Sequence, residues 1–102
     1  MNNKFTNLNE IVSLINESIN HPMVVLIEGK PLSVGLISQV IINDAMISIQ
    51  LRTRNGKLFY HPEVFTFELI VSFTILKKAI SDIIEVTYED GTKTQIEIYL
   101  WK

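Results

Sequence analysis

The strongest constraint on the fold is an alternating segment at the end of the chain, residues 83–101, interrupted by Asp90-Gly91. Apolar and polar residues that alternate on both sides of such a pair are typical of a β-hairpin. A two-residue turn would set apolar residues against polar ones on one face, whereas a three-residue loop, residues 89–91, removes this conflict. The longer loop pairs Val86 with Thr94 and Ile84 with Ile96. The sequence therefore predicts a type I turn that ends in a left-handed Gly91.

The beginning of the chain has a helical period instead. Between residues 8 and 19 one apolar stripe recurs at the spacing of a helix face, formed by Leu8, Ile11, Val12, Ile15 and Ile19. Thr6 or Asn7 can cap this helix, and His21-Pro22 ends it, because proline disfavours helical geometry in the residue before it. An amphipathic helix is predicted, and its apolar stripe needs a surface to pack on.

Residues 23–61 alternate with period two and are divided by turn residues at 29–31, 43–44 and 55–56. The strands expected between these breaks are 23–28, 32–42, 45–54 and 57–61. Loops of three, two and two residues put one apolar set on the same side of a four-stranded meander: Val24, Leu26, Val34, Leu36, Val40, Ile47, Leu51, Leu58 and Tyr60. The opposite face is mixed, with Val25, Ile27, Ile37, Ile41, Met46 and Phe59 beside polar residues, so we expect something to cover part of it.

The segment 62–82 fits two patterns. Its apolar residues alternate as in a strand, but several also fall on one helical face, and Pro62 suits a first helical position. Aromatic and β-branched residues favour a strand as far as Ser72, and a short helix is predicted from 74 to 82. The expected fold is a single α+β domain, residues 1–102, with an N-terminal helix packed on about six or seven antiparallel strands and a short helix before the final hairpin.

An alternative architecture comes from a resemblance. The run Leu26-Ile27-Glu28-Gly29-Lys30-Pro31-Leu32 and its surroundings resemble Sm-like barrels, which also place a helix before a strand, a glycine turn and a long bent strand. The spacing to Gly35 departs from that family's motif, and its Asp-Met-Asn signature is absent. The resemblance implies a small SH3/Sm-like barrel with an N-terminal helix.

Composition narrows the functional classes. The chain of 102 residues is 47% hydrophobic, which exceeds what so small a core can bury, and we therefore expect a homo-oligomer, a dimer. A formal charge of −2 argues against bulk electrostatic binding to nucleic acid. The absence of cysteine and of any apolar run near the ~18 residues of a membrane span predicts a cytoplasmic protein that does not enter a membrane.

Catalytic motifs are missing. No G-x-S-x-G elbow, P-loop or zinc spacing occurs, and each of the two histidines, His21 and His61, precedes a proline. With Glu63 they would form a two-histidine, one-carboxylate metal set, but residues beside prolines are more typical of turns. We predict no enzyme, no cofactor and no metal.

The candidate binding residues lie in two places. Arg52, Arg54 and Lys57 surround the Asn55-Gly56 turn, and Phe59 is expected opposite Arg52 in a cation–π pair. The closing hairpin leaves Tyr99 and Trp101 on its otherwise polar face, where they form either a local cluster or an external contact.

These features favour a small binding protein (an inhibitor, immunity protein or adaptor) that acts by occluding a protein partner. The alternative is a small barrel that binds single-stranded nucleic acid or a nucleotide through the basic 52–57 turn, with Phe59 as a stacking surface.

Overall fold

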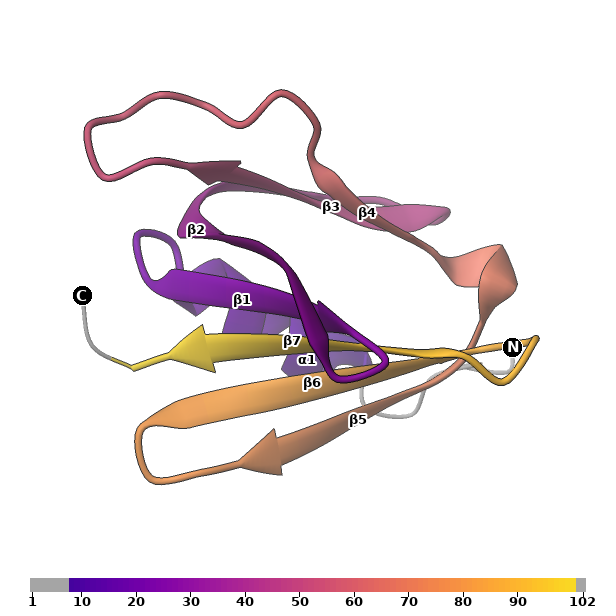
Figure 1. The fold of residues 1–102 in the computed structure, drawn as a ribbon. Coiled ribbons are helices and arrows are strands. Elements are labelled where there is room, and N and C mark those ends of the chain that lie inside the picture. Colours follow the sequence, from indigo (N-terminus) through magenta and orange to yellow (C-terminus); the bar gives the residue numbers. More distant parts are fainter. Residues whose placement is uncertain (1–7, 101–102) are drawn as a thin grey trace.

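A computed structural model describes residues 8–100 of the chain. These residues form one α-helix, seven strands and a short 3₁₀ helix: α1 (Leu8–Glu17), β1 (Pro22–Ile27), β2 (Lys30–Ile42), β3 (Met46–Arg52), β4 (Glu63–Thr66), η1 (Phe67–Leu69), β5 (Ile70–Lys77), β6 (Ser81–Tyr88) and β7 (Lys93–Tyr99). All strands belong to one antiparallel sheet in the order β4-β3-β2-β1-β7-β6-β5 (Figure 1). The predicted α+β class is confirmed.

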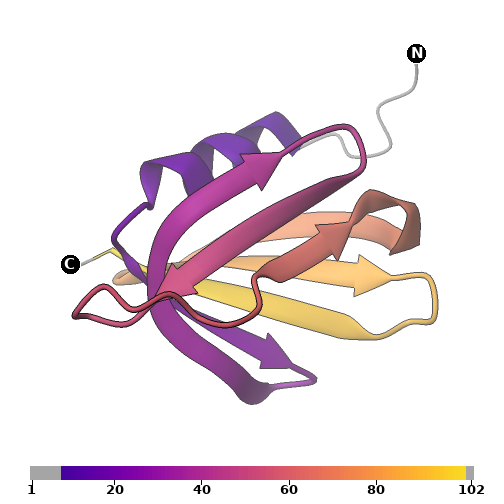
Figure 2. The ribbon, with the colours of Figure 1, turned by 90° about the horizontal axis from the view of Figure 1, so that it is seen from above.

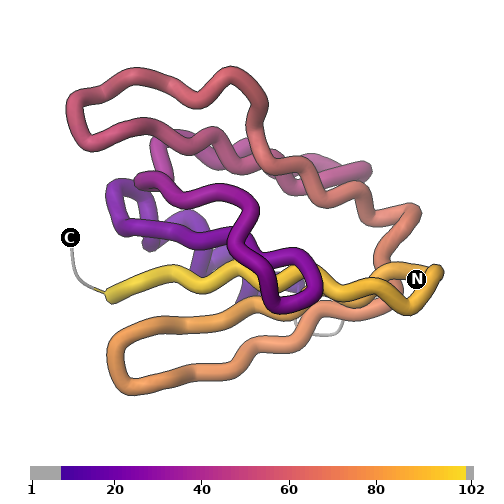
Figure 3. Tube along the Cα trace, viewed as in Figure 1, coloured from indigo at the N-terminus to yellow at the C-terminus, as the bar shows by residue number. Residues whose placement is uncertain are grey.

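The long strand β2 bends the sheet into two layers. Its first half pairs with β1 and its second half pairs with β3, with a β-bulge in each ladder. Bulges increase local twist, and the β3–β4 arm consequently lies over β1, β7, β6 and β5 (Figures 1 and 2). The first strand β1 and the last strand β7 lie side by side in the middle of the sheet (Figure 3). Since β4 and β5 remain at its ends, the sheet is not the closed barrel of the alternative expectation.

Helix α1 runs along one side of the bent sheet and contacts β2 and β5 (Figure 2). Its residues Ile11 and Ile15 are fully buried, which confirms the centre of the predicted apolar stripe, whereas Ile19 lies beyond the helix and is exposed. They pack on the inner face of the sheet, which also supplies Met23, Val25, Ile37, Ile47, Ile49, Leu51, Phe65, Ile70, Phe73, Ile84, Val86, Ile96 and Ile98. No helix in the described range has the length and hydrophobicity needed to cross a membrane.

The helix ends at Glu17, two residues before the predicted end. The Ser18 hydroxyl donates to the Leu14 carbonyl at 2.6 Å, and Asn20 adopts a positive φ of 75°, as residues just past a helix end often do. The chain then turns into β1 through a hydrogen bond from Asn20 N to the Ile37 carbonyl at 2.7 Å. The predicted N-cap residues, Thr6 and Asn7, lie outside the described residues.

The closing hairpin has the predicted register. Val86 pairs with Thr94 and Ile84 with Ile96, and Gly91 has a φ of 88°. Tyr88 N donates to the Thr92 carbonyl at 2.9 Å across the three-residue loop. Asp90 Oδ1 accepts hydrogen bonds from the Thr92 amide and hydroxyl, which hold the turn from inside.

The predicted faces of β1 and of the first half of β2 are wrong. Val25 and Ile37, assigned to the mixed face, are 1% and 0% exposed, whereas Val34, assigned to the core, is 60% exposed. Val24 pairs with Val34 and not with Leu36. The bulges interrupt strict alternation, so a single inward face cannot be followed through them by counting residues.

Two of the predicted turns are displaced. The β1–β2 turn is Glu28-Gly29, both with positive φ, and not residues 29–31. At the next turn Asn43 N donates to the Met46 carbonyl, and the Asn43 side chain accepts the amides of Ala45 and Met46. This side-chain turn moves the reversal one residue onward, to 44–45.

The pairing of β2 with β3 moves accordingly. A reversal at 43–44 would pair Val40 with Ile47, but Val40 pairs with Ile49. Leu51 likewise pairs with Ile37 and not with Leu36. The pairing thus moves by two residues at Val40 but by one at Leu51, on either side of the bulge, and Ile47 and Leu51 are nevertheless both buried.

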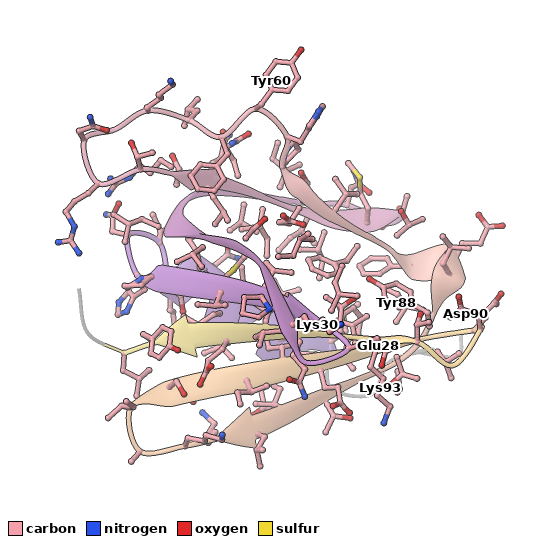
Figure 4. The ribbon with its side chains drawn as sticks, viewed as in Figure 1. Glu28, Lys30, Tyr60, Tyr88, Asp90 and Lys93 are labelled. Carbon is pink, nitrogen blue, oxygen red and sulfur yellow. The ribbon has the colours of Figure 1, made fainter. Side chains whose placement is uncertain are left out.

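The predicted strand at 57–61 does not form. A single isolated bridge, between Arg52 and Leu58, pairs this segment with β3. The fourth strand of the meander is β4. Tyr60, expected in the core, is 92% exposed and points away from the molecule (Figure 4).

The predicted short helix at 74–82 is also wrong. Strand β5 continues to Lys77, and a tight turn, closed by Lys78 N to the Ser81 carbonyl at 2.8 Å, leads into β6. The ladder between β5 and β6 continues to the pair of Lys77 and Asp82, so pairing with β6 overrides the helical spacing. The stretch expected as one strand up to Ser72 is divided by η1 into β4 and β5.

Candidate functional site

The basic loop that follows β3 has a defined internal structure. Thr53 N donates to the Lys57 carbonyl at 2.8 Å, and Gly56 N donates to the Thr53 carbonyl at 3.1 Å. The Thr53 hydroxyl accepts the Lys57 amide at 3.0 Å and also bonds the Asn55 side chain. Three residues, 54–56, therefore lie between the paired positions, and the chain after them is shifted by one residue relative to the predicted register.

This shift changes the surroundings of Arg52. Arg52 stands opposite Leu58 and not opposite Phe59, so the predicted register for a cation–π pair is wrong. Its guanidinium donates to the Thr53 carbonyl and to Asn20 Oδ1, both at 3.0 Å. Arg52 thus ties the basic loop to the turn that follows α1.

A hollow of about 230 Å³ lies beside the loop, and we call it the basic hollow. Its lining consists of Pro22, Val34, Gly35, Leu36, Arg52, Thr53, Arg54 and Phe59. Its apolar lining, which we call the floor, comes from two neighbouring strands: Pro22 from β1, and Val34 and Leu36 from β2. Arg52 and Arg54 also line it, so the hollow combines apolar surface with positive charge.

Phe59 forms a wall of this hollow and is not an open stacking surface. The tip of its ring lies close to Gly35, where an added Cβ would be only 2.8 Å from Phe59 Cζ. The side chain is half-buried against the core, and Phe59 N donates to the Leu51 carbonyl at 2.9 Å. Gln50 Nε2 holds the Phe59 carbonyl at 2.9 Å. The ring is therefore only partly accessible to a base or sugar.

The exposed cations of the site are Arg54 and Lys57. Both residues are exposed, and neither side chain makes a hydrogen bond or ion pair with any other residue in the range 8–100. The sequence between Ala45 and Pro62 contains no acid, so the loop carries local positive charge in an acidic protein. These two groups are available to an acidic partner.

Sequence reasoning placed the apolar neighbours of the loop in the core, but they are exposed. Leu58 and Tyr60 lie within three residues after Lys57, and both are largely accessible. Tyr60 stacks edge-on against His61 with ring centroids 4.6 Å apart. Alternation could not reveal this exposure, because it assumed a strand that does not form.

The second candidate site, at the chain end, is used internally as far as the structure describes it. The Tyr99 hydroxyl donates to Glu97 Oε1 at 3.2 Å, while Glu97 Oε2 accepts from the Ser81 hydroxyl at 2.8 Å. Partial burial raises the pKa of the Tyr99 phenol, and the negative charge of Glu97 raises it further. Tyr99 belongs to a local cluster, and Trp101 lies outside the described residues.

The residues considered for a metal set have other roles. His21 Nδ1 lies 2.8 Å from the Tyr99 carbonyl, and Glu63 Oε1 accepts from the Ser33 hydroxyl at 2.9 Å. Among residues 8–100 no three histidine or acidic side chains are grouped closely enough to hold a metal ion.

Comparison with known proteins adds a distant likeness. No protein-family model matches the chain, and no curated protein matches it in sequence. One solved structure, the pleckstrin homology (PH) domain of USP37, matches with a TM-score of 0.43 and 14% identity, covering 78% of this chain and 79% of that chain. The similarity is too low to transfer a site or a ligand between the two proteins.

Proposed function

We propose that this protein is a small, non-enzymatic binding protein that occludes a protein partner, as an inhibitor, immunity protein or adaptor does. The partner binds the basic hollow through a segment that carries both acidic and apolar side chains. The observation that supports this most is that Arg54 lines the same hollow as the apolar floor and that Lys57 lies in the same loop. Neither cation has a partner within the described chain. An acidic side chain gains a charge-assisted bond there, and an apolar neighbour covers the floor.

The charge distribution supports a fast encounter with such a partner. The protein is acidic overall, whereas the loop 52–57 contains three cations and no acid. Charges at the rim of an interface act mainly on the association rate and make it depend on salt. Capture should therefore weaken as ionic strength rises.

The experiment is affinity capture from the native host followed by mass spectrometry, with two matched charge-reversal variants. Arg54→Glu with Lys57→Glu should abolish capture of the main partner. Lys30→Glu with Lys93→Glu makes the same change in charge near the β1–β2 turn, away from the basic loop (Figure 4), and should capture normally. Equal capture by both variants would exclude the loop as the contact.

The competing hypothesis is binding of single-stranded nucleic acid or a nucleotide at the same loop. The partial burial of Phe59 against the core disfavours it, because less of the ring is accessible for base stacking. Fluorescence-anisotropy titration with mixed-sequence RNA and DNA at low salt separates the two. Micromolar binding that Arg54→Glu with Lys57→Glu removes would replace the protein partner by a nucleic acid.

The proposal includes a cytoplasmic setting and a homodimer. Large apolar side chains are exposed on several strands, among them Leu32, Val34, Ile41, Val71 and Leu76. A second copy of the chain would cover part of this surface. Light scattering at tens of micromolar should report a dimer, and a monomer at that concentration would remove this part of the proposal.

A further inference from the structure

A second hollow, of about 350 Å³, lies between α1 and the ends of β5 and β6, and we call it the acidic hollow. Two of its carboxylates, Glu10 and Glu17, come from α1, and the third, Asp82, comes from β6. Carboxylates outnumber Lys77, the ammonium group in the lining, by three to one. The basic hollow shares no residue with this one.

Asp82 is the unusual residue of this hollow. It is only 6% exposed, and its carboxylate makes no hydrogen bond or ion pair with any residue from 8 to 100. No fully inaccessible side-chain oxygen or nitrogen in that range lacks a partner, so the carboxylate oxygens of Asp82 still reach solvent. Asp82 belongs to the lining of the hollow, and its remaining exposure therefore opens into it.

The position of Asp82 in β6 explains its burial. It continues the inward-facing row of Val86 and Ile84, which are both fully buried, and it stands opposite the buried Ile98 of β7. An unpaired carboxylate at the end of an apolar row loses part of its hydration without gaining a bond. An unpaired carboxylate at such a position lowers the stability of the fold unless a cation occupies the space beside it.

Lys77 is the obvious internal candidate for that cation, and the structure does not use it. Lys77 and Asp82 face each other across β5 and β6, next to the hydrogen-bonded pair of Lys78 and Ser81. Opposite side chains at such a position are close, yet the lysine remains exposed and makes no ion pair with Asp82. The carboxylate thus stays open to a cation from outside.

We propose that the acidic hollow binds an organic cation, an ammonium or guanidinium group carried on a short aliphatic stem. Asp82 bonds the charged head, Glu17 adds attraction from α1, and the stem lies along Leu14, Ile75 and Leu100. A divalent metal is a poorer fit, because the acids are not grouped closely enough to coordinate one ion. The cation comes either from a free alkylamine or from a lysine or arginine side chain of a polypeptide.

The test is an NMR titration of the full chain with two probes: n-butylammonium, and a short peptide with one lysine between glycines. Both should shift the backbone amides of Ser18, Lys77 and Asp82 in a saturable way, while an all-glycine peptide should not. Tighter binding of the lysine peptide assigns the site to a polypeptide, and equal binding assigns it to a free amine. No saturable shift with either probe overturns the proposal.

Variants separate binding from a structural role. Asp82→Asn should weaken binding at least tenfold and raise the melting temperature without ligand, since it removes a buried unpaired charge. Glu17→Gln should weaken binding several-fold at unchanged melting temperature, and the control Glu68→Gln, on η1, should change neither. A lower melting temperature for both Asp82→Asn and Lys77→Ala would show an internal ion pair and overturn the proposal.

This inference does not depend on the basic hollow. Arg54→Glu with Lys57→Glu, which should abolish capture of the protein partner, should leave binding of butylammonium unchanged within twofold. Failure of the one experiment therefore leaves the other intact, and a common loss in this variant would contradict the separation of the two sites.

Discussion

Two glycine turns in this protein carry the same sequence signal and have different outcomes. Asp90-Gly91 closes a full ladder between β6 and β7, whereas Asn55-Gly56 is followed by a single bridge to β3. Both glycines have a positive φ, 88° and 95°, so the local reversal forms in each. The difference begins after the turn.

The neighbours of each segment explain the difference. Strand β7 lies between β1 and β6 and buries Thr94, Ile96 and Ile98 on its inner face. The segment after Gly56 has only the end of β3 beside it, and the rest of that edge is taken by β4. A turn residue specifies a reversal, but a ladder forms only where an apolar face can be buried.

Truncation in the two arms should give the largest contrast. Ile96 is 1% exposed, so Ile96→Ala should lower the free energy of unfolding by about 2–5 kcal/mol. Leu58 is 58% exposed, so Leu58→Ala should change the free energy of unfolding by no more than about 0.5 kcal/mol. Urea unfolding at equilibrium measures both, and similar losses would mean that the loop is packed as tightly as the hairpin.

A double-mutant cycle sharpens the role of Phe59, the residue that attaches the loop to the sheet. Gly35→Ala should cost about 1–3 kcal/mol, because its Cβ would lie 2.8 Å from Phe59 Cζ. Phe59→Ala removes that clash, so the double variant should be more stable than the sum of the single losses by at least about 0.5 kcal/mol. Strict additivity would place the strain on the Arg52 carbonyl or on Leu51 Cβ, both 3.2 Å away, and not on the ring.

The two glycines themselves provide a smaller effect. Gly91→Ala should destabilise by roughly 1 kcal/mol, because alanine disfavours the positive φ and the ladder on both sides holds the turn in place. Gly56→Ala faces the same φ in an exposed loop that can rearrange, so its loss should be less than half as large. A loss of equal size in the two variants would show that the 53–57 loop is as constrained as the hairpin turn.

The smallest effect is on pH dependence at the end of β7. The folded state raises the pKa of Tyr99 above its ordinary value of about 10, so the folded chain holds the proton more tightly than the unfolded chain. The stability that Tyr99 contributes is therefore fully present below pH about 10 and is lost as pH rises through the pKa of Tyr99 in the folded chain. Tyr99→Phe should flatten this decline in melts between neutral and alkaline pH, and an unchanged decline would assign it to other groups.

Much of the fold could be predicted where local pattern and global packing agree. The helix stripe of Ile11 and Ile15 and the hairpin pairing of Ile84 with Ile96 are both present. The positions of Arg54 and Lys57 beside a turn were also predicted, because charged residues around an Asn-Gly pair are exposed in almost any fold. The partners of Arg52 and Phe59 could not be predicted. The loop is one residue longer than expected, which places Leu58 and not Phe59 opposite Arg52.

The sequence by itself determined the features that depend on residues close along the chain. An amphipathic period, a proline after a histidine and a glycine in a three-residue loop act through backbone preference and one-sided burial. Tertiary structure decided which faces of β1 and β2 are buried, how β1 meets β7, and where the two hollows form. These depend on bulges and on contacts between distant segments, whose free energy arises only when the whole sheet has formed.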